Sequence, residues 1–254
     1  MNIIILAAGY ATRLYPLTLN KPKPLLEVAG KPMMEWVIDN LAPIEGIEKV
    51  CVVTNNKFAG DFRAWADGYA RTHGKLAFEI INDGSASDSE KLGAIGDLNL
   101  VISRANLAGS DLIVVAGDNL FSESLEEFGR FCAQKQQPVL GVYDAGSLEE
   151  AKKYGVVTID STGVITSFEE KPAAPRSTLI GIALYYYPME TVGMVATYIA
   201  AGNNPDQPGR FVQWLYQRTP VQTWKVPGTW FDVGSKETLE QANELFAQFA
   251  SVAK

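Results

Sequence analysis

The chain is nearly without histidine and cysteine, and this scarcity excludes several kinds of chemistry. Its 254 residues include one histidine and two cysteines. His73 precedes Gly74 near the end of an expected helix, where a helix C-terminus favours an imidazole for structural reasons. Cys51 and Cys132 show no metal-ligand spacing and are typical of buried thiols in a reducing compartment. We therefore expect neither a histidine base nor a zinc site.

The chain also lacks a Lys/Arg-rich block and a long apolar run. Its formal net charge is −7, whereas a nucleic-acid surface needs clustered positive charge. No apolar run reaches membrane-spanning length, and the N-terminal strand has no basic leader. We therefore expect a cytoplasmic protein that binds neither nucleic acid nor membrane. Any bound polyphosphate would be neutralised by a few placed cations and a metal ion.

Strands and helices alternate along the first part of the chain. Apolar residues make up 47% of the sequence, which is enough for a large core. The alternation over residues 2–143 predicts an α/β fold with a doubly wound, mostly parallel, Rossmann-like sheet and helices on both faces. We expect a single domain over 1–254, with a core at 1–145 and a lobe with the C-terminal helix at 146–254. The lobe is expected to extend the same sheet.

The expected helix starts follow from side chains that can accept a backbone hydrogen bond. Asp88 or Ser89 is expected to begin a helix that ends near residue 103. Ser122 is expected to begin the helix over 123–135, and Ser235 the last helix over 236–250. Aromatic residues that recur at helical spacing over 58–69 predict core packing.

Polar or small residues follow three of the expected strands at their carboxyl ends. They are the loop at 6–13, the turn at 82–88 and Asp118. Ligands of open α/β sheets bind at the carboxyl ends of strands. The loop carries Arg13, and Lys23 follows it between two prolines. Backbone N–H groups of such a loop can approach phosphate oxygens closely while the cations neutralise them. We therefore expect the loop to bind the triphosphate of a nucleotide.

The loop has neither of the two common phosphate-binding sequences, because it lacks a Lys-Ser/Thr ending and has one glycine. With Thr12-Arg13-Leu14 and Lys23, its spacing resembles that of the sugar-phosphate nucleotidylyltransferases, most closely the glucose-1-phosphate thymidylyltransferase branch. The resemblance covers nearly the whole chain in order and continues through Gly117-Asp118-Asn119, Glu170-Lys171-Pro172 and Trp230-Phe231-Asp232-Val233-Gly234.

The resemblance implies a nucleotidyltransferase that joins an NTP and a sugar 1-phosphate and releases pyrophosphate. The core would bind the nucleotide (dTTP, UTP or CTP) and the lobe the acceptor. Arg13 would contact the β- and γ-phosphates and Lys23 the α-phosphate. The other expected nucleotide-binding residues are Leu6, Ala8, Gly9, Asn82, Gly84 and Asp88.

The resemblance also implies an acceptor subsite and a metal site. Lys171, the third expected catalytic residue, would bind the phosphate of the acceptor, and Glu170 its hydroxyl groups. Gly155 matches a glycine whose backbone contacts the sugar. Asp118 and Asp232 match the two aspartates that bind Mg²⁺, an ion that prefers hard oxygen ligands and leaves positions for phosphate and water.

Two departures from the family pattern leave the substrates open. The thymidylyltransferase branch reads the base with a glutamine and a Pro-x-Gly segment, whereas residues 82–88 here form a different polar turn. Asn82 could still bond a base edge, since an amide both donates and accepts. Ala11 replaces a second loop glycine and adds a Cβ that restricts φ slightly.

Two rival functions remain open, and so does the possibility of a homo-oligomer. The first is a CTP-dependent cytidylyltransferase for phosphocholine or another phosphomonoester, for which an aromatic cage is expected. Tyr185, Tyr186, Tyr187 and Trp230 are candidates, although strand geometry sends the three tyrosines to different faces. The second is a non-catalytic regulator that binds nucleotide sugars, a role that would not require the metal aspartates.

Overall fold

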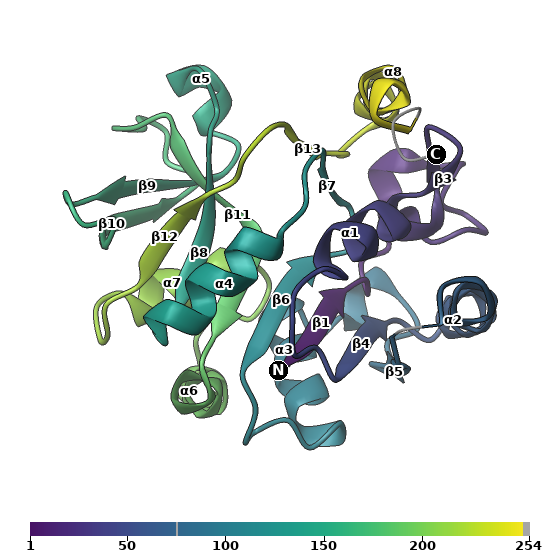
Figure 1. Cartoon of the computed structure of the whole chain (residues 1–254), viewed down its shortest axis with the longest axis horizontal. Coiled ribbons are helices and arrows are strands. Elements are labelled where there is room, and N and C mark those ends of the chain that lie inside the picture. The colour runs from purple at the N-terminus through teal and green to yellow at the C-terminus, as the bar shows by residue number, and fades with distance from the viewer. Residues whose placement is uncertain (75, 251–254) are drawn as a thin grey trace.

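A computed structural model, which describes residues 1–74 and 76–250, contains a nine-stranded sheet that runs through both halves of the chain (Figure 1). Its main path has the order β10-β9-β11-β6-β1-β4-β5, and β8 and β12 join it beside β11. The predicted α/β class, with parallel strands in the core of the sheet and helices on both faces, is confirmed.

The first part of the chain contributes four parallel strands. They are β1 (Asn2–Leu6), β4 (Lys49–Thr54), β5 (Phe78–Asn82) and β6 (Leu112–Ala116). β1 lies between β4 and β6, in a register that pairs Ile4 with Cys51 and with Val114. The side chains of Ile3, Ile4 and Ile5 are almost completely buried, because a central parallel strand is covered on both faces.

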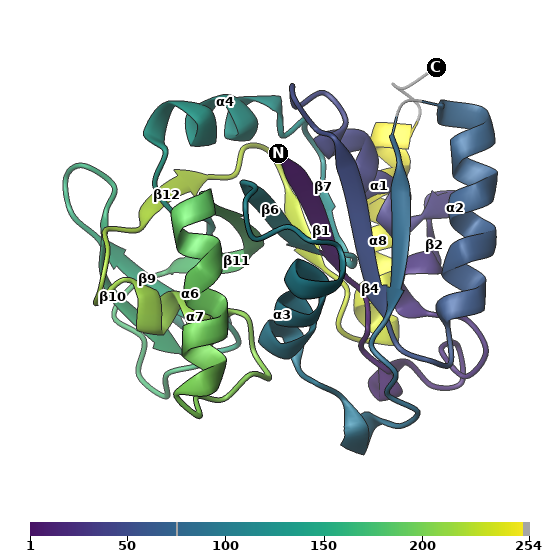
Figure 2. The same cartoon turned by 90° about the horizontal axis from the view of Figure 1, so that it is seen from below.

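Helices cover the two faces of the sheet in separate groups. α1 (Met33–Leu41), α2 (Ala59–His73) and α4 (Glu126–Lys135) contribute to one buried cluster. α3 (Ala94–Arg104), α6 (Met189–Ala200) and α7 (Gly209–Leu215) contribute to the other. Figure 2 shows α4 and the group of α3, α6 and α7 on opposite sides of the sheet. The predicted aromatic stripe of α2 packs in the core, as expected.

The lobe extends the same sheet with strands that are mainly antiparallel. They are β9 (Gly155–Ile159), β10 (Ile165–Glu170), β11 (Leu179–Tyr187) and β12 (Gln222–Lys225), and they join the sheet together with β8 (Val139–Asp144), the last strand of the first part of the chain. β11 runs antiparallel to β6, β8 and β9 and so joins the two halves. Tyr185 and Tyr187 face one buried cluster and Tyr186 the other, as alternation along a strand requires.

Several short elements were not expected from the sequence. α5 (Leu148–Ala151), the hairpin of β2 (Glu27–Val28) and β3 (Lys31–Pro32), and two short 3₁₀ segments at Thr12–Leu14 and Lys23–Leu25 lie in predicted loops. A third 3₁₀ segment, Asp88–Glu90, lies where a helix was expected to begin. A separate two-stranded sheet pairs β7 (Asn119–Phe121) with β13 (Trp230–Asp232). The C-terminal helix α8 (Lys236–Ala250) packs Phe246 against Trp36 of α1.

Two of the expected helix starts are wrong and one is confirmed. Asp88 lies in a 3₁₀ turn, and α3 begins only at Ala94, after Gly93 adopts a positive φ. The Ser122 hydroxyl accepts a hydrogen bond from the N–H of Thr229 instead of starting α4. Ser235 does cap α8, since its hydroxyl accepts from the N–H of Thr238 at 3.2 Å.

Among the described residues, no helix is long and apolar enough to cross a membrane.

Candidate active site

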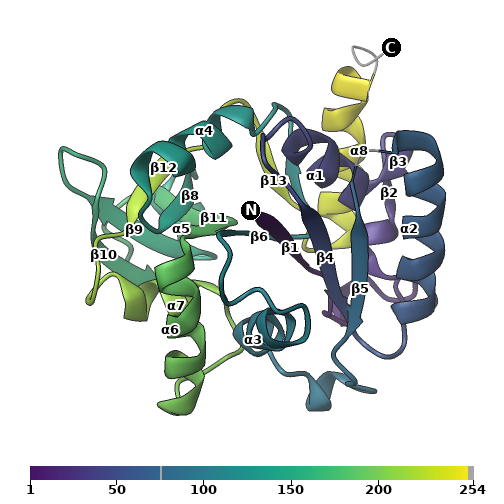
Figure 3. The same cartoon turned by 60° about the horizontal axis from the view of Figure 1, so that its bottom comes forward.

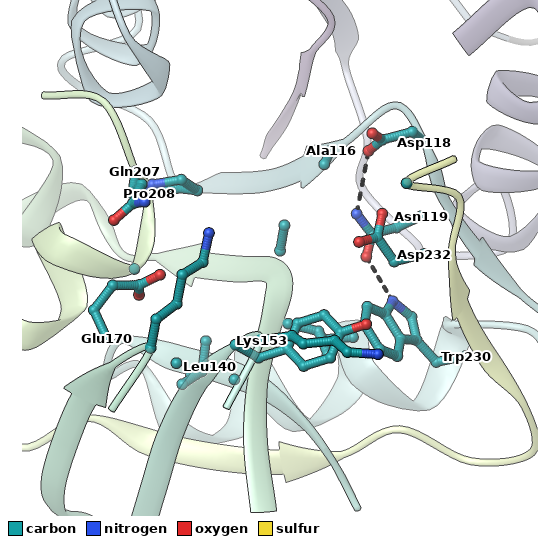
Figure 4. Close-up of a pocket in the computed structure, with 18 of the residues that line it drawn as sticks. Ala116, Asp118, Asn119, Leu140, Lys153, Glu170, Gln207, Pro208, Trp230 and Asp232 are labelled. Carbon is teal, nitrogen blue, oxygen red and sulfur yellow. Dashed lines mark hydrogen bonds between the residues drawn. The ribbon is translucent and has the colours of Figure 1, made fainter. Parts of the chain in front are cut away.

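A cavity of about 710 Å³ opens between the first part of the chain and the lobe. Figure 4 shows Asp118, Asn119 and Asp232 on one side of it, with Glu170 and Gln207 on the other. Six of the seven predicted catalytic, acceptor-binding and metal residues line it, all but Lys23. These residues, which come from distant parts of the sequence, are Arg13, Asp118, Gly155, Glu170, Lys171 and Asp232.

The two predicted metal aspartates are brought together by the short β7–β13 sheet. Its antiparallel register pairs Asp232 with Asn119, the residue after Asp118. The Trp230 indole N–H donates to Asn119 Oδ1 at 2.5 Å, which fixes the two strands side by side. Burial raises the pKa of Asp232, and the neighbouring Asp118 raises it further. Two hard oxygen donors under mutual repulsion suit a divalent cation such as Mg²⁺.

Three cations surround this carboxylate pair. Lys23 Nζ forms an ion pair with Asp118 Oδ2, in which the lysine side chain is 13% exposed. Arg13, Lys23 and Lys171 all oppose the rise in the pKa of Asp232, so each lies within electrostatic range of it. Lys23 itself is outside the cavity lining and reaches the site through Asp118.

The loop that carries Arg13 is held in place by hydrogen bonds between side chains and the backbone. Asn55 Nδ2 donates to the carbonyl of Ala8 at 2.9 Å, and the Thr18 hydroxyl donates to the carbonyl of Ala11 at 2.8 Å. The Tyr10 hydroxyl donates to the carbonyl of Ser85 at 3.0 Å and so ties the loop to the turn after β5. These bonds place Arg13 on a fixed turn at the end of β1.

Ala11 adopts a left-handed backbone conformation with a φ of 48°. The sequence analysis therefore underestimated the conformational cost of Ala11, because a residue with a Cβ is disfavoured at positive φ. We expect Ala11→Gly to raise the free energy of unfolding by about 0.5–1 kcal/mol, as measured by urea denaturation. The matched control is Ala64→Gly in the exposed interior of α2, which should lower it by a similar amount. A destabilised Ala11→Gly variant would contradict this account of the loop.

The side of the cavity formed by the lobe combines Glu170, Lys171 and two glycines. Lys171 has a φ of 48°, and its N–H donates to the carbonyl of Tyr154 at 3.0 Å. Such a conformation in a non-glycine residue is often found at functional sites. Burial raises the pKa of Glu170. A Cβ on Gly155 would lie 3.2 Å from Glu170 Oε2, and one on Gly209 only 2.6 Å from it.

Aromatic side chains form part of the wall between the two sides. Tyr154 and Trp230 line the cavity with their ring centroids 5.5 Å apart. Burial raises the pKa of Tyr154 to about 12, with further contributions from Asp232 and Glu150. Of the residues expected for an aromatic cage, Tyr185 and Trp230 line this cavity, whereas Tyr186 and Tyr187 do not.

The remaining predicted nucleotide-binding residues lie outside the cavity lining. Leu6 ends β1 and is followed by Ala8 and Gly9, while Asn82 ends β5 and is followed by Gly84 and Asp88. The Asn82 amide is already bonded within the protein, because it donates to Asn56 Oδ1 and accepts from the N–H of Gly84, both at 2.9 Å. The six predicted nucleotide-binding residues therefore lie beside the cavity, at the same edge of the sheet.

Some cavity residues were missed by the sequence analysis. Lys153 lines the cavity and pairs with Glu150, and the segment 207–209 lines it on the side of Glu170. The sequence analysis singled out no residue of that segment. Its contact with Glu170 depends on tertiary packing.

The chain belongs to the nucleotidyl transferase family, whose model matches residues 2–248. It is 25% identical to the bifunctional protein GlmU of Methanocaldococcus jannaschii over 96% of this chain and 54% of that protein. It is 28% identical to the UTP–glucose-1-phosphate uridylyltransferase AglF of Haloferax volcanii, over 74% of this chain and 72% of that protein. The expected family is confirmed.

A solved structure of a Bacillus anthracis protein, assigned as a glucose-1-phosphate thymidylyltransferase and bound to sucrose, has the same fold. It matches with a TM-score of 0.82 and 25% identity, over 98% of this chain and 99% of that one. By contrast, the chain spans only 54% to 60% of the length of several curated relatives.

Proposed function

We propose that the chain is a sugar-1-phosphate nucleotidyltransferase that joins an NTP and a sugar 1-phosphate to give an NDP-sugar and pyrophosphate. Residues 1–145 bind the nucleotide, and residues 146–254 bind the acceptor. The observation that carries the proposal is the convergence of Arg13, Lys23 and Lys171 on the half-buried pair of Asp118 and Asp232. A binding module for neutral sugars would not need this arrangement of charge.

The proposed reaction needs no general base. An oxygen of the ionised acceptor phosphate attacks the α-phosphorus of the NTP, and pyrophosphate leaves in line with the attack. Arg13 neutralises the β- and γ-phosphates and the leaving pyrophosphate. Lys23 holds the α-phosphate, and Lys171 orients the attacking phosphate. These roles are positioning and charge stabilisation, which supply most of the catalysis in phosphoryl-type transfers.

Asp118 and Asp232 would hold Mg²⁺. When bound, the ion would neutralise phosphate oxygens and help to align the two reacting groups. The protein's own part is to keep the two carboxylates side by side through β7 and β13 and to surround them with fixed cations.

The substrates are proposed from the cavity and the relatives together. Leu6, Ala8, Gly9, Asn82, Gly84 and Asp88 form the nucleotide side, where dTTP, UTP or CTP is bound. Glu170, Gly155 and Lys171 form the acceptor side, where Glu170 accepts hydrogen bonds from sugar hydroxyls. A sugar is favoured over phosphocholine because two of the four aromatic residues expected for a cage lie away from the cavity.

The experiment is a pyrophosphate-release screen with Mg²⁺. It pairs each of dTTP, UTP, CTP, GTP and ATP with glucose 1-phosphate, mannose 1-phosphate, N-acetylglucosamine 1-phosphate and phosphocholine. We expect release with at least one sugar 1-phosphate, and loss of release when Mg²⁺ is chelated. Release with phosphocholine alone would favour the cytidylyltransferase, and binding of nucleotide sugars without any release would favour the regulator.

A further inference from the structure

The α6–α7 loop, residues 201–208, lies within the lobe and contacts the start of α3 in the first part of the chain. It follows α6, and its last residues Gln207 and Pro208 line the cavity, as does the first residue of α7, Gly209. Figures 2 and 3 show α3 on the same side of the sheet as α6 and α7. The loop therefore lies between the start of α3 and the acceptor side of the cavity.

The first turn of α3 is bonded to this loop. The N–H of Ala94 donates to the carbonyl of Asp206 at 3.2 Å, and the N–H of Ile95 donates to that of Pro205 at 2.8 Å. A helix start leaves such N–H groups without acceptors inside the helix. Here the carbonyl groups of the α6–α7 loop accept these hydrogen bonds. The fit is close, because a Cβ on Gly93 would lie 2.6 Å from the Pro205 carbonyl oxygen.

Lys91 links the loop to the turn after β5. Its Nζ lies 3.1 Å from Asp206 Oδ1 in the loop and 4.0 Å from Asp88 Oδ1 in the turn. Asp88 belongs to the segment proposed to contact the nucleotide. One ammonium group therefore contacts a carboxylate from each side of the site.

At its other end the loop lies against Glu170. A Cβ on Gly209 would lie 2.6 Å from Glu170 Oε2 and 3.0 Å from Phe168 Cζ. Arg210 Nε donates to Gln207 Oε1 at 3.1 Å, and its charge opposes the rise in the pKa of Glu170. A shift of the loop would therefore change the surroundings of the carboxylate proposed to bind the sugar.

We propose that the α6–α7 loop couples the nucleotide subsite to the acceptor subsite, with Lys91 and Asp206 as positioning residues. This inference rests on the proposed function. A nucleotide that orders the turn at 82–88 holds α3 and the loop in place, and the loop then places Gln207 and Gly209 beside Glu170. By linkage, bound nucleotide tightens acceptor binding, and bound acceptor tightens nucleotide binding by the same factor.

The test is hydrogen–deuterium exchange on the whole chain, with and without Mg²⁺ and each of the five NTPs of the screen. We expect the nucleotide that binds to slow exchange in residues 82–95 and also in residues 201–209. Lys91→Gln should keep the first effect and lose most of the second, and Lys91→Arg should restore it. The control is Lys49→Gln, which removes a partly exposed ion pair with Glu79 at the opposite end of the strands.

Steady-state kinetics give a second readout with the best substrate pair from the screen. The Lys91–Asp206 pair is partly exposed, so Lys91→Gln or Asp206→Asn should raise the KM for the acceptor only about 2–5-fold. The KM for the NTP should change less, a split that general destabilisation would not produce.

Slowed exchange at 82–95 without slowed exchange at 201–209 would overturn the coupling and leave the proposed function intact. If no NTP slows exchange anywhere and no pair releases pyrophosphate, the proposed function is overturned, and the coupling with it.

Discussion

Asp232→Asn is expected to lower turnover in pyrophosphate release by on the order of 10²–10³. The amide keeps the shape of the side chain but removes half of the charge that would hold Mg²⁺. Arg13→Ala is expected to cause a loss of similar size, because the leaving pyrophosphate would lose its cation. Both rates are measured at saturating substrates with the best pair from the screen.

The stability of Asp232→Asn separates a role in the site from a role in the fold. Asp232 is half-buried beside Asp118, and its loss of solvent and this neighbour both disfavour its charged form. A neutral amide should therefore leave the Tm at pH 8 unchanged or higher while activity is lost. The control is Glu150→Gln at the edge of the cavity, which should keep near-normal turnover. Near-normal turnover in Asp232→Asn would reject the metal assignment.

Asp97→Asn is expected to stabilise the protein above pH 7. Asp97 is 5% exposed, and its Oδ1 has no hydrogen-bond partner among the described residues. Burial, with a further contribution from Asp83, raises its pKa to about 7. Asp83 is itself 9% exposed and accepts from the N–H and hydroxyl of Ser85.

The sign of the pH effect follows from this raised pKa. Between the ordinary value of 3.8 and about 7, the folded state holds a proton that the unfolded state has lost. Stability therefore falls as the pH rises through this window, by on the order of 4 kcal/mol, and is constant with respect to this group above it.

Urea denaturation between pH 4 and 8 measures the predicted effect of Asp97. The wild type should lose stability across the window, whereas Asp97→Asn should show a flatter profile and a higher stability at pH 8. The control, Asp88→Asn, changes an exposed carboxylate of the same segment and should follow the wild type. A steep profile in Asp97→Asn that parallels the wild type would show that another group titrates.

Long periodic segments made most of the fold predictable from sequence. The isoleucines of β1 and the aromatic stripe of α2 are buried as their spacing indicates. Helix starts were less predictable, because Ser122 is bonded to Thr229, a residue far along the chain. A hydroxyl that can cap a helix can equally bond a distant strand, and local sequence does not distinguish the two.

Several residues that line the cavity could be singled out from the sequence, but the contacts that bring them together could not. The resemblance to the family singled out Asp118 and Asp232, and the structure shows that a β7–β13 pairing brings them together. β7 has only three residues, too few for a periodic signal. The contacts of Lys91 with Asp206, and of Gly209 with Glu170, join segments that sequence spacing leaves unrelated.

Iron-directed cleavage tests the central claim, a metal–phosphate centre between β7 and β13. Fe²⁺ replaces Mg²⁺ in the presence of the NTP that binds, and ascorbate with peroxide then cuts the backbone beside the ion. The account predicts two cuts, one beside Asp118 and one beside Asp232, both lost in Asp232→Asn. Cuts confined to another acidic region, such as residues 83–97, would contradict it.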